Sequence, residues 1–176
     1  TLNFTMERNL KQELRDWIYN ELSFPDPELG NDVPVCPYAK QAWDRGQVKL
    51  IEVDQHDMWD EVHRQVLHFN DDYRVIIIAA EAGDTNYIEH EARCMALNHW
   101  FSHISKNIWL LAYLGEEVMV FIQRLDDLDD ASMCLSKLGY YDNYDPDRYE
   151  ELISNRHRAR EHNDARQNEK RNGHDA

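Results

Sequence analysis

A continuous apolar run of strand length, Arg74–Ala80 (RVIIIAA), is the feature of the sequence that most restricts the fold. A strand with apolar side chains on both faces must be covered on both faces, which is typical of parallel strands flanked by helices. Val48–Val53 is a second stretch rich in β-branched residues, and residues 58–69 between the two have an amphipathic helical pattern. Strand, helix and strand in this order predict a right-handed βαβ unit.

The remaining periodicity extends this unit into a single α/β domain over residues 1–154. We expect a four-stranded mixed sheet with crossover helices, an N-terminal helix packed alongside and a C-terminal helical extension. The predicted elements outside the βαβ unit are helices over 5–22, 85–106, 129–138 and 146–158, and strands over 108–114 and 118–123 joined by a turn at Gly115-Glu116. Residues 155–176 hold no apolar residue larger than Ala. We therefore expect a polar tail there, either a frayed helix or disordered.

The charge of the chain excludes one class of function. The sequence has 19 Lys and Arg against 34 Asp and Glu, and residues 1–154 hold 13 against 30, a formal net charge of −17. Such a body repels a phosphate backbone, so we expect no direct binding of nucleic acid by it. Two interpretations of the acidity stay open: a solvated surface that keeps the protein soluble, or a surface that binds a basic protein partner.

Nothing in the sequence predicts a membrane segment. No stretch approaches the ~18 consecutive apolar residues that a spanning helix needs. The start, Thr1 to Phe4, has neither a basic region nor an apolar run. We therefore expect a soluble, cytoplasmic protein.

A cysteine at the end of a long loop is the first candidate site. Residues 24–37 are rich in proline and deliver Cys36 to the start of a short helical stretch that closes at Gly46. A helix N-terminus stabilises a thiolate, and a nearby lysine adds to this effect. We hypothesise a reactive thiol at Cys36, with Tyr38 and Lys40 as its catalytic partners. The alternative is a small side chain that fills a pocket under the loop.

The same segment carries a resemblance to a known family. Cys36-Pro37-Tyr38-Ala39-Lys40, followed by Gly46-Gln47-Val48, resembles the Cys-Pro-Phe-Ala-Lys segment and Gly-Gln-Val strand of the bacterial family known as domain of unknown function 1415. The later His-Pro signature of that family has no counterpart in residues 108–123. The resemblance implies a compact α/β domain with the Cys36 loop as its hallmark, and it implies no particular reaction.

A pair of histidines is the second candidate site. His99 and His103 are four residues apart on a predicted helix, so both project from one face and can chelate a divalent metal. A third ligand is expected from His56, Asp60 or His63, provided that the two helices pack on the same face of the sheet. The alternative is a heavily buried helix whose histidines hydrogen-bond to neighbouring groups.

Two other features favour structural roles. Asp129 or Asp130 in the acidic run 126–130 serves as the cap of the following helix, because the run lacks the alternating ligands of a calcium loop. Cys36, Cys94 and Cys134 are far apart and indicate neither a disulfide framework nor a zinc knuckle.

Two hypotheses of function follow. The first is a small-molecule enzyme or binding protein with its site at the Cys36 loop, near strand ends, where α/β sheets usually place their pockets. The second is a regulatory or interaction protein without enzymatic activity that uses its acidic surface against a basic protein partner.

Overall fold

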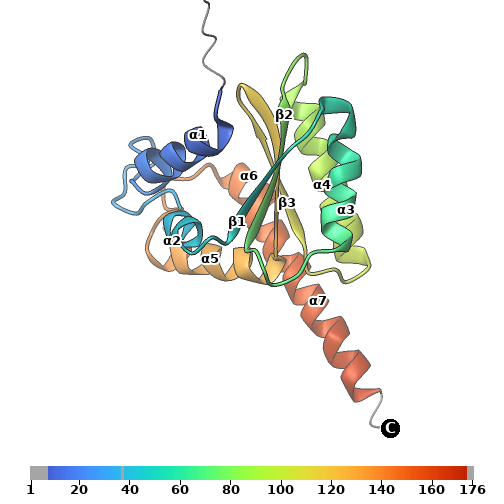
Figure 1. The fold of residues 1–176 in the computed structure, drawn as a ribbon. Helices are drawn as coiled ribbons and strands as arrows, with labels where there is room; N and C mark the ends of the chain where they lie inside the picture. The colour runs from blue at the N-terminus through green and yellow to red at the C-terminus, as the bar shows by residue number, and fades with distance from the viewer. Residues whose placement is uncertain (1–7, 37, 174–176) are drawn as a thin grey trace, which may run out of the picture.

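A four-stranded mixed sheet with the strand order β1-β2-β4-β3 forms the centre of the molecule (Figure 1). The computed structural model describes residues 8–36 and 38–173. Strands β1 (Val48–Glu52) and β2 (Val75–Glu81) pair in parallel and are connected through helix α3 (Met58–Leu67). Strands β3 (Trp109–Leu114) and β4 (Glu117–Gln123) form an antiparallel hairpin, and β4 pairs with β2. The predicted α/β class and βαβ unit are confirmed.

The first face of the sheet is covered by α3 and by helix α4 (Tyr87–His103). Side chains from alternate positions of the two inner strands, β2 and β4, face these helices and are almost fully buried: Ile76, Ile78, Ala80, Val118, Val120 and Ile122. Figure 1 shows both helices on this side of the sheet. Because alternate side chains of a strand point to opposite faces, the residues between them must be covered from the other side.

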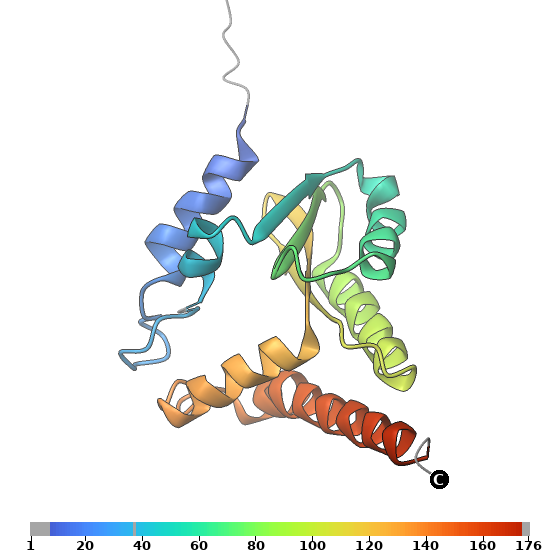
Figure 2. The same ribbon diagram turned by 60° about the horizontal axis from the view of Figure 1, so that its bottom comes forward.

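The second face of the sheet is covered by the N-terminal helices. Helix α1 (Leu10–Trp17) and the π-helical turn that follows it (Ile18–Leu22) pack on Ile77, Ala79 and Met119. The short helix α2 (Ala39–Asp44) lies beside them (Figure 2). The N-terminal helix that the sequence predicts over 5–22 is therefore present from residue 10 to residue 22. Residues 5–7 of this prediction lie outside the described residues.

The C-terminal third adds a layer of helices below the sheet. Helix α5 (Leu125–Lys137) is followed by helix α6 (Pro146–Tyr149), a π-helical turn (Glu150–Ser154) and helix α7 (Asn155–Asn172). Figure 2 shows α5 and α7 side by side. No helix within the described part of the chain is both long and apolar enough to cross a membrane.

Helix α7 differs from the polar tail that the sequence predicts. It is regular to Asn172 and packs against α4 and α5. The contacts that hold it are polar, which is why a search for apolar periodicity misses them. His157 and Arg160 bind the buried carboxylate of Asp129, and Asn163 donates a hydrogen bond to the Lys106 carbonyl over 3.3 Å.

The cap that the sequence predicts at Asp129 or Asp130 is also wrong. Helix α5 begins at Leu125, four residues earlier than predicted, so both aspartates lie inside the helix. The amides at its start are satisfied by Asn107, whose carbonyl accepts from Leu125 and whose side chain accepts from Asp126 over 3.0 Å. A partner far away in the sequence thus replaces the local cap.

Candidate functional site

The loop before Cys36 is fixed at both of its ends. Val35 donates its amide to the Phe24 carbonyl over 3.1 Å, and Cys36 donates to the Leu22 carbonyl over 2.8 Å. Two side chains fasten its middle to the segment after α5: Asn31 donates to the Tyr140 carbonyl over 3.0 Å, and Asn143 donates to the Leu29 carbonyl over 2.9 Å. The loop therefore holds Cys36 in a defined place.

Cys36 borders a cavity of about 530 Å³ on the second face of the sheet. We call it the Cys36 cavity. Its walls come from α1 and its π-helical turn, from α2, from the sheet and from α5, and they are predominantly apolar. The apolar side chains that line it include Leu14, Trp17, Ile18, Leu22, Val48, Val75, Ile77, Leu111, Phe121 and Leu128. The half-buried Cys36 thus lies next to an open space and is not enclosed by aliphatic groups.

The electrostatics of the Cys36 thiol are opposite to those that the sequence suggests. Burial raises its pKa, and hydrogen bonds from the amides of Tyr38 and Ala39 lower it by less. Helix α2 has only six residues, so little dipole is available to stabilise a thiolate. Cys36 is therefore protonated near neutral pH, and the activated nucleophile expected from the sequence is not supported.

The two predicted partners of Cys36 lie in different places. Tyr38 lines the cavity, and its hydroxyl hydrogen-bonds to Cys134 on α5; partial burial and this contact raise the pKa of Tyr38. Lys40 is not among the residues that line the cavity, because its ammonium lies 4.9 Å from the centre of the Tyr19 ring. The structure thus brings together Cys36, Tyr38 and Cys134, and it does not bring Lys40 to them.

One end of the Cys36 cavity is polar. Gln47 precedes β1, Arg74 precedes β2 and Gln123 ends β4, and all three line the cavity. The Gln47 carbonyl accepts hydrogen bonds from the amides of Arg74 over 2.8 Å and Val75 over 3.2 Å, and Val75 pairs with Gln123 across the sheet. Strand pairing therefore gathers these three residues, although they are far apart in the sequence.

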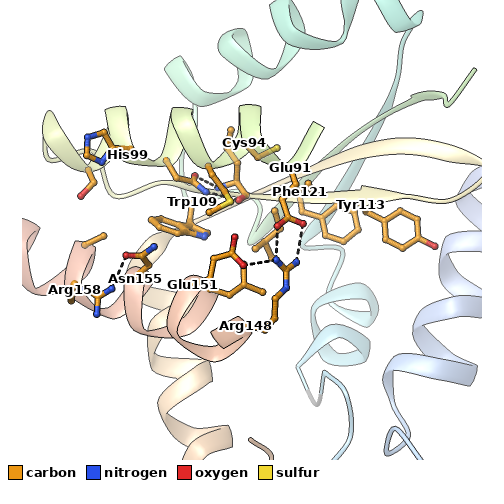
Figure 3. A pocket seen from close by; sticks show the side chains of 18 of the residues that line it. Glu91, Cys94, His99, Trp109, Tyr113, Phe121, Arg148, Glu151, Asn155 and Arg158 are labelled. Atoms are coloured by element: carbon orange, nitrogen blue, oxygen red, sulfur yellow. Dashed lines mark hydrogen bonds and ion pairs between the residues drawn. The ribbon is translucent and has the colours of Figure 1, made fainter. Parts of the chain in front are cut away.

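A second cavity of about 500 Å³ lies along the free edge of β3, between α4 and α7 (Figure 3). The consecutive residues 109–113 all line it. Since alternate side chains of a strand point to opposite faces, a cavity that touches all of them lies along the strand edge. Figure 3 shows Arg148 at this cavity, between Glu91 and Glu151. Arg148 binds both oxygens of Glu91, at 2.7 and 2.9 Å, and this bond lowers the pKa of Glu91.

A buried side-chain amide satisfies the backbone groups at the beginning of the free edge of β3. The Asn98 side chain on α4 donates to the Leu110 carbonyl over 2.8 Å and accepts from the Leu110 amide over 2.7 Å. The carboxamide thereby takes the place that a neighbouring strand would occupy. This contact connects α4 firmly to the sheet.

The predicted histidine pair does not gather ligands around it. His99 and His103 are both exposed, and His99 borders the second cavity. Within residues 8–36 and 38–173, the group of three or more potential ligands close enough to share an ion consists of Asp54, His56 and Asp57, all exposed. The predicted third ligand His63 instead has its Nδ1 2.6 Å from the Trp59 carbonyl oxygen.

The sequence predicts, as the alternative to a metal site, that α4 is heavily buried, and this is correct for one side of the helix. His90, Cys94, Asn98 and Phe101 are buried, and His90 Nε2 lies 2.7 Å from the Met119 carbonyl oxygen. The opposite side is not buried, since Ile88 at its start is exposed. The alternative of a buried, hydrogen-bonded histidine therefore describes His90 and does not describe the proposed ligand pair.

Comparison with known proteins identifies the family. The family model described as Domain of unknown function (DUF6875) matches residues 11–105, just over half of the chain. The chain belongs to this family. The DUF6875 match spans the Cys36 loop, the βαβ unit and α4, and it supports this family rather than domain of unknown function 1415, which the Cys36 segment resembles. No curated protein and no solved structure gives a significant match to the chain.

Cys134, Gln123 and Arg74 are among the lining residues of the Cys36 cavity that sequence reasoning missed. Cys134 lies in α5 without a motif around it, and no local signal connects it with Cys36. Gln123 and Arg74 lie at strand ends, where α/β sheets usually place their pockets. This position is the signal in the sequence that could have predicted them as lining residues.

Proposed function

We propose that this DUF6875 chain is a binding protein for a small, largely apolar molecule, which occupies the Cys36 cavity. The observation that carries the proposal is the cavity itself, about 530 Å³ with apolar walls supplied by helices and by the sheet. This volume lies within the range of about 300–1,000 Å³ that is usual for ligand pockets. The walls belong to regular elements, so the space is held open by the fold.

Binding is a better account of this cavity than nucleophilic catalysis. The thiol of Cys36 has a raised pKa, so it is a weak nucleophile at neutral pH. Cys134 and Tyr38 add a thiol and a phenol to the same wall, with the two groups hydrogen-bonded to each other. Such groups orient a ligand through weak hydrogen bonds and soft contacts while most of its surface meets hydrocarbon.

A cavity-filling variant tests this proposal. Ala131 lines the Cys36 cavity from α5, so Ala131→Phe places a ring in the space that the ligand needs. Ala96→Phe is the matched control, because Ala96 is an exposed position in the middle of α4 that lines neither cavity. Binding of decan-1-ol is measured by calorimetry, and circular dichroism checks that both variants are folded.

The outcomes separate clearly. We expect the wild type and Ala96→Phe to bind decan-1-ol and Ala131→Phe to lose this binding. If the wild type binds neither decan-1-ol nor other neutral apolar probes of similar size, the cavity is not a ligand site. Equal binding by the folded Ala131→Phe variant places the bound molecule elsewhere and also contradicts the proposal.

The charges of the chain support a second function, the binding of a basic protein partner. Several of the arginines are held in ion pairs within the chain, among them Arg8, Arg64, Arg124 and Arg148, so they do not offset the acidic excess at other places. A basic protein partner fits such a surface. Binding of such a partner to the acidic surface must weaken steeply as salt shortens the Debye length from ~10 Å to ~3 Å. An affinity that is insensitive to salt contradicts this function.

A further inference from the structure

We propose that the molecule bound in the Cys36 cavity carries a carboxylate, and that Arg74 binds this group at the polar end of the cavity. This inference rests on the proposed function, because it names the chemical class of the ligand for the same site. The inference goes beyond the proposed function by assigning a residue that determines specificity.

Three charged side chains line the Cys36 cavity: Arg74, Asp127 and Asp130. Both aspartates have an ion-pair partner inside the molecule, which each shares with other carboxylates. Asp127 is 3.2 Å from the guanidinium of Arg124, and Asp130 pairs with Arg160 of α7. Arg74 makes no ion pair with any carboxylate in the part of the chain that the structure describes. Arg74 is therefore the charged residue of the cavity lining that has no ion-pair partner within residues 8–36 and 38–173.

The position of Arg74 suits a ligand head group. Its main chain is fixed by the hydrogen bond to the Gln47 carbonyl at the start of β2, while its side chain is exposed. The side chains of Gln47 and Gln123 line the same end of the cavity and offer neutral amide donors. The rest of the wall is hydrocarbon, so an amphipathic molecule places its charged end here and its body between α1, α5 and the sheet.

A carboxylate fits this end better than a phosphate does. A guanidinium binds either group through two parallel hydrogen bonds, so the charge of the head group decides between them. A phosphate carries a larger negative charge, and the chain around it is acidic, with a formal net charge of −15. One guanidinium beside two aspartates offsets a single negative charge more readily than two.

The test compares two probes that share a hydrocarbon chain and differ in the head group. Decanoate and decan-1-ol are titrated into the wild type, Arg74→Gln and Arg45→Gln at neutral pH and low salt. Arg45 is the matched control, since it is exposed, lies at the end of α2 and does not line the cavity. We expect the wild type and Arg45→Gln to bind decanoate about tenfold more tightly than decan-1-ol. Arg74→Gln is expected to lose this preference while its affinity for decan-1-ol stays the same.

Each other outcome overturns a stated part of the reasoning. Equal affinity of the wild type for both probes shows that the cavity does not select an anion, and the proposed function then stands without this inference. A preference for decanoate that persists in Arg74→Gln, or that falls equally in Arg45→Gln, removes Arg74 as the selecting residue. Failure of the wild type to bind either probe contradicts the proposed function itself.

Discussion

The buried carboxylate of Asp129 carries the attachment of α7 to α5, and its removal gives the sharpest test of the fold. Only 1% of the side chain is exposed. His157 Nδ1 lies 2.9 Å from one carboxylate oxygen and 3.1 Å from the other, and Arg160 lies 3.3 Å away. Arg156 is also buried nearby and donates to the Ser132 hydroxyl. The buried carboxylate thus pairs with groups that come from a single face of α7, and the exposed Glu161, Asp130 and Asp164 pair with the same groups from outside.

The cost of Asp129→Asn follows from this arrangement. Removing one partner of a buried ion pair costs about 3–5 kcal/mol, because the remaining charge is left without compensation. His157 and Arg160 keep 40% and 24% of their side chains exposed, so water solvates part of their charge. Their ion pairs with Glu161, Asp130 and Asp164 also remain in the variant. We therefore expect the lower end, about 3 kcal/mol. The neighbouring Asp130 is 63% exposed and also pairs with Arg160, so Asp130→Asn is expected to cost less than about 1 kcal/mol.

Urea unfolding followed by circular dichroism measures both free energies, and native-state hydrogen exchange reports whether the α7 amides lose protection. Asp129→Asn is expected to lower the protection of α7 more than that of β2. Equal losses of unfolding free energy in Asp129→Asn and Asp130→Asn contradict a structural role for the buried carboxylate. A larger loss of unfolding free energy in Asp130→Asn than in Asp129→Asn favours the exposed ion pair as the stabilising contact and contradicts the buried network.

Three further predictions concern separate contacts. The hydrogen bond that His157 donates to Asp129 raises the pKa of His157 above its unfolded value. Its stabilising effect is therefore present below about pH 6 and is lost as pH rises through the folded pKa, and the pH dependence of unfolding must flatten in His157→Gln. Asn98→Leu leaves a buried amide and carbonyl of β3 without partners and is expected to cost about 2–4 kcal/mol in urea unfolding, and a smaller loss than 1 kcal/mol contradicts the bridging role. Iodoacetamide near neutral pH must label the exposed Cys134 before Cys36, whose pKa is raised by burial, and peptide mass mapping that finds Cys36 labelled first refutes this order.

The parts of the fold that were open to prediction from sequence are those that local patterns encode. The Arg74–Ala80 run indicates a strand buried on both faces, and the structure places Ile76 and Ile78 under α3 and α4 and Ile77 under α1. The period of residues 58–69 indicates the crossover helix in the same way. Such predictions succeed because burial of apolar side chains at a regular spacing decides both the element and its orientation.

The parts that sequence did not reveal depend on polar groups that meet across long stretches of chain. Asn107 closes the start of α5, Asn98 closes the edge of β3, and Asp129 holds α7. Each of these residues is unremarkable in its own segment, and the partner that makes it important is brought near by the packed fold. A search for helix caps or apolar faces gives such residues a local role, as it does for Asp129, which the sequence predicts to cap the helix that follows it.

The candidate site shows the same division between local and long-range information. The loop that delivers Cys36 is visible in the sequence, but the reactivity of the thiol depends on what surrounds it. The wall that forms a cavity for an apolar molecule also removes water from the sulfur, and this desolvation raises the thiol pKa. A cavity of this kind therefore binds through its walls more readily than it reacts through its cysteine. The charge needed to select a ligand must then come from the rim of the cavity, where Arg74 has no ion-pair partner in the described part of the chain.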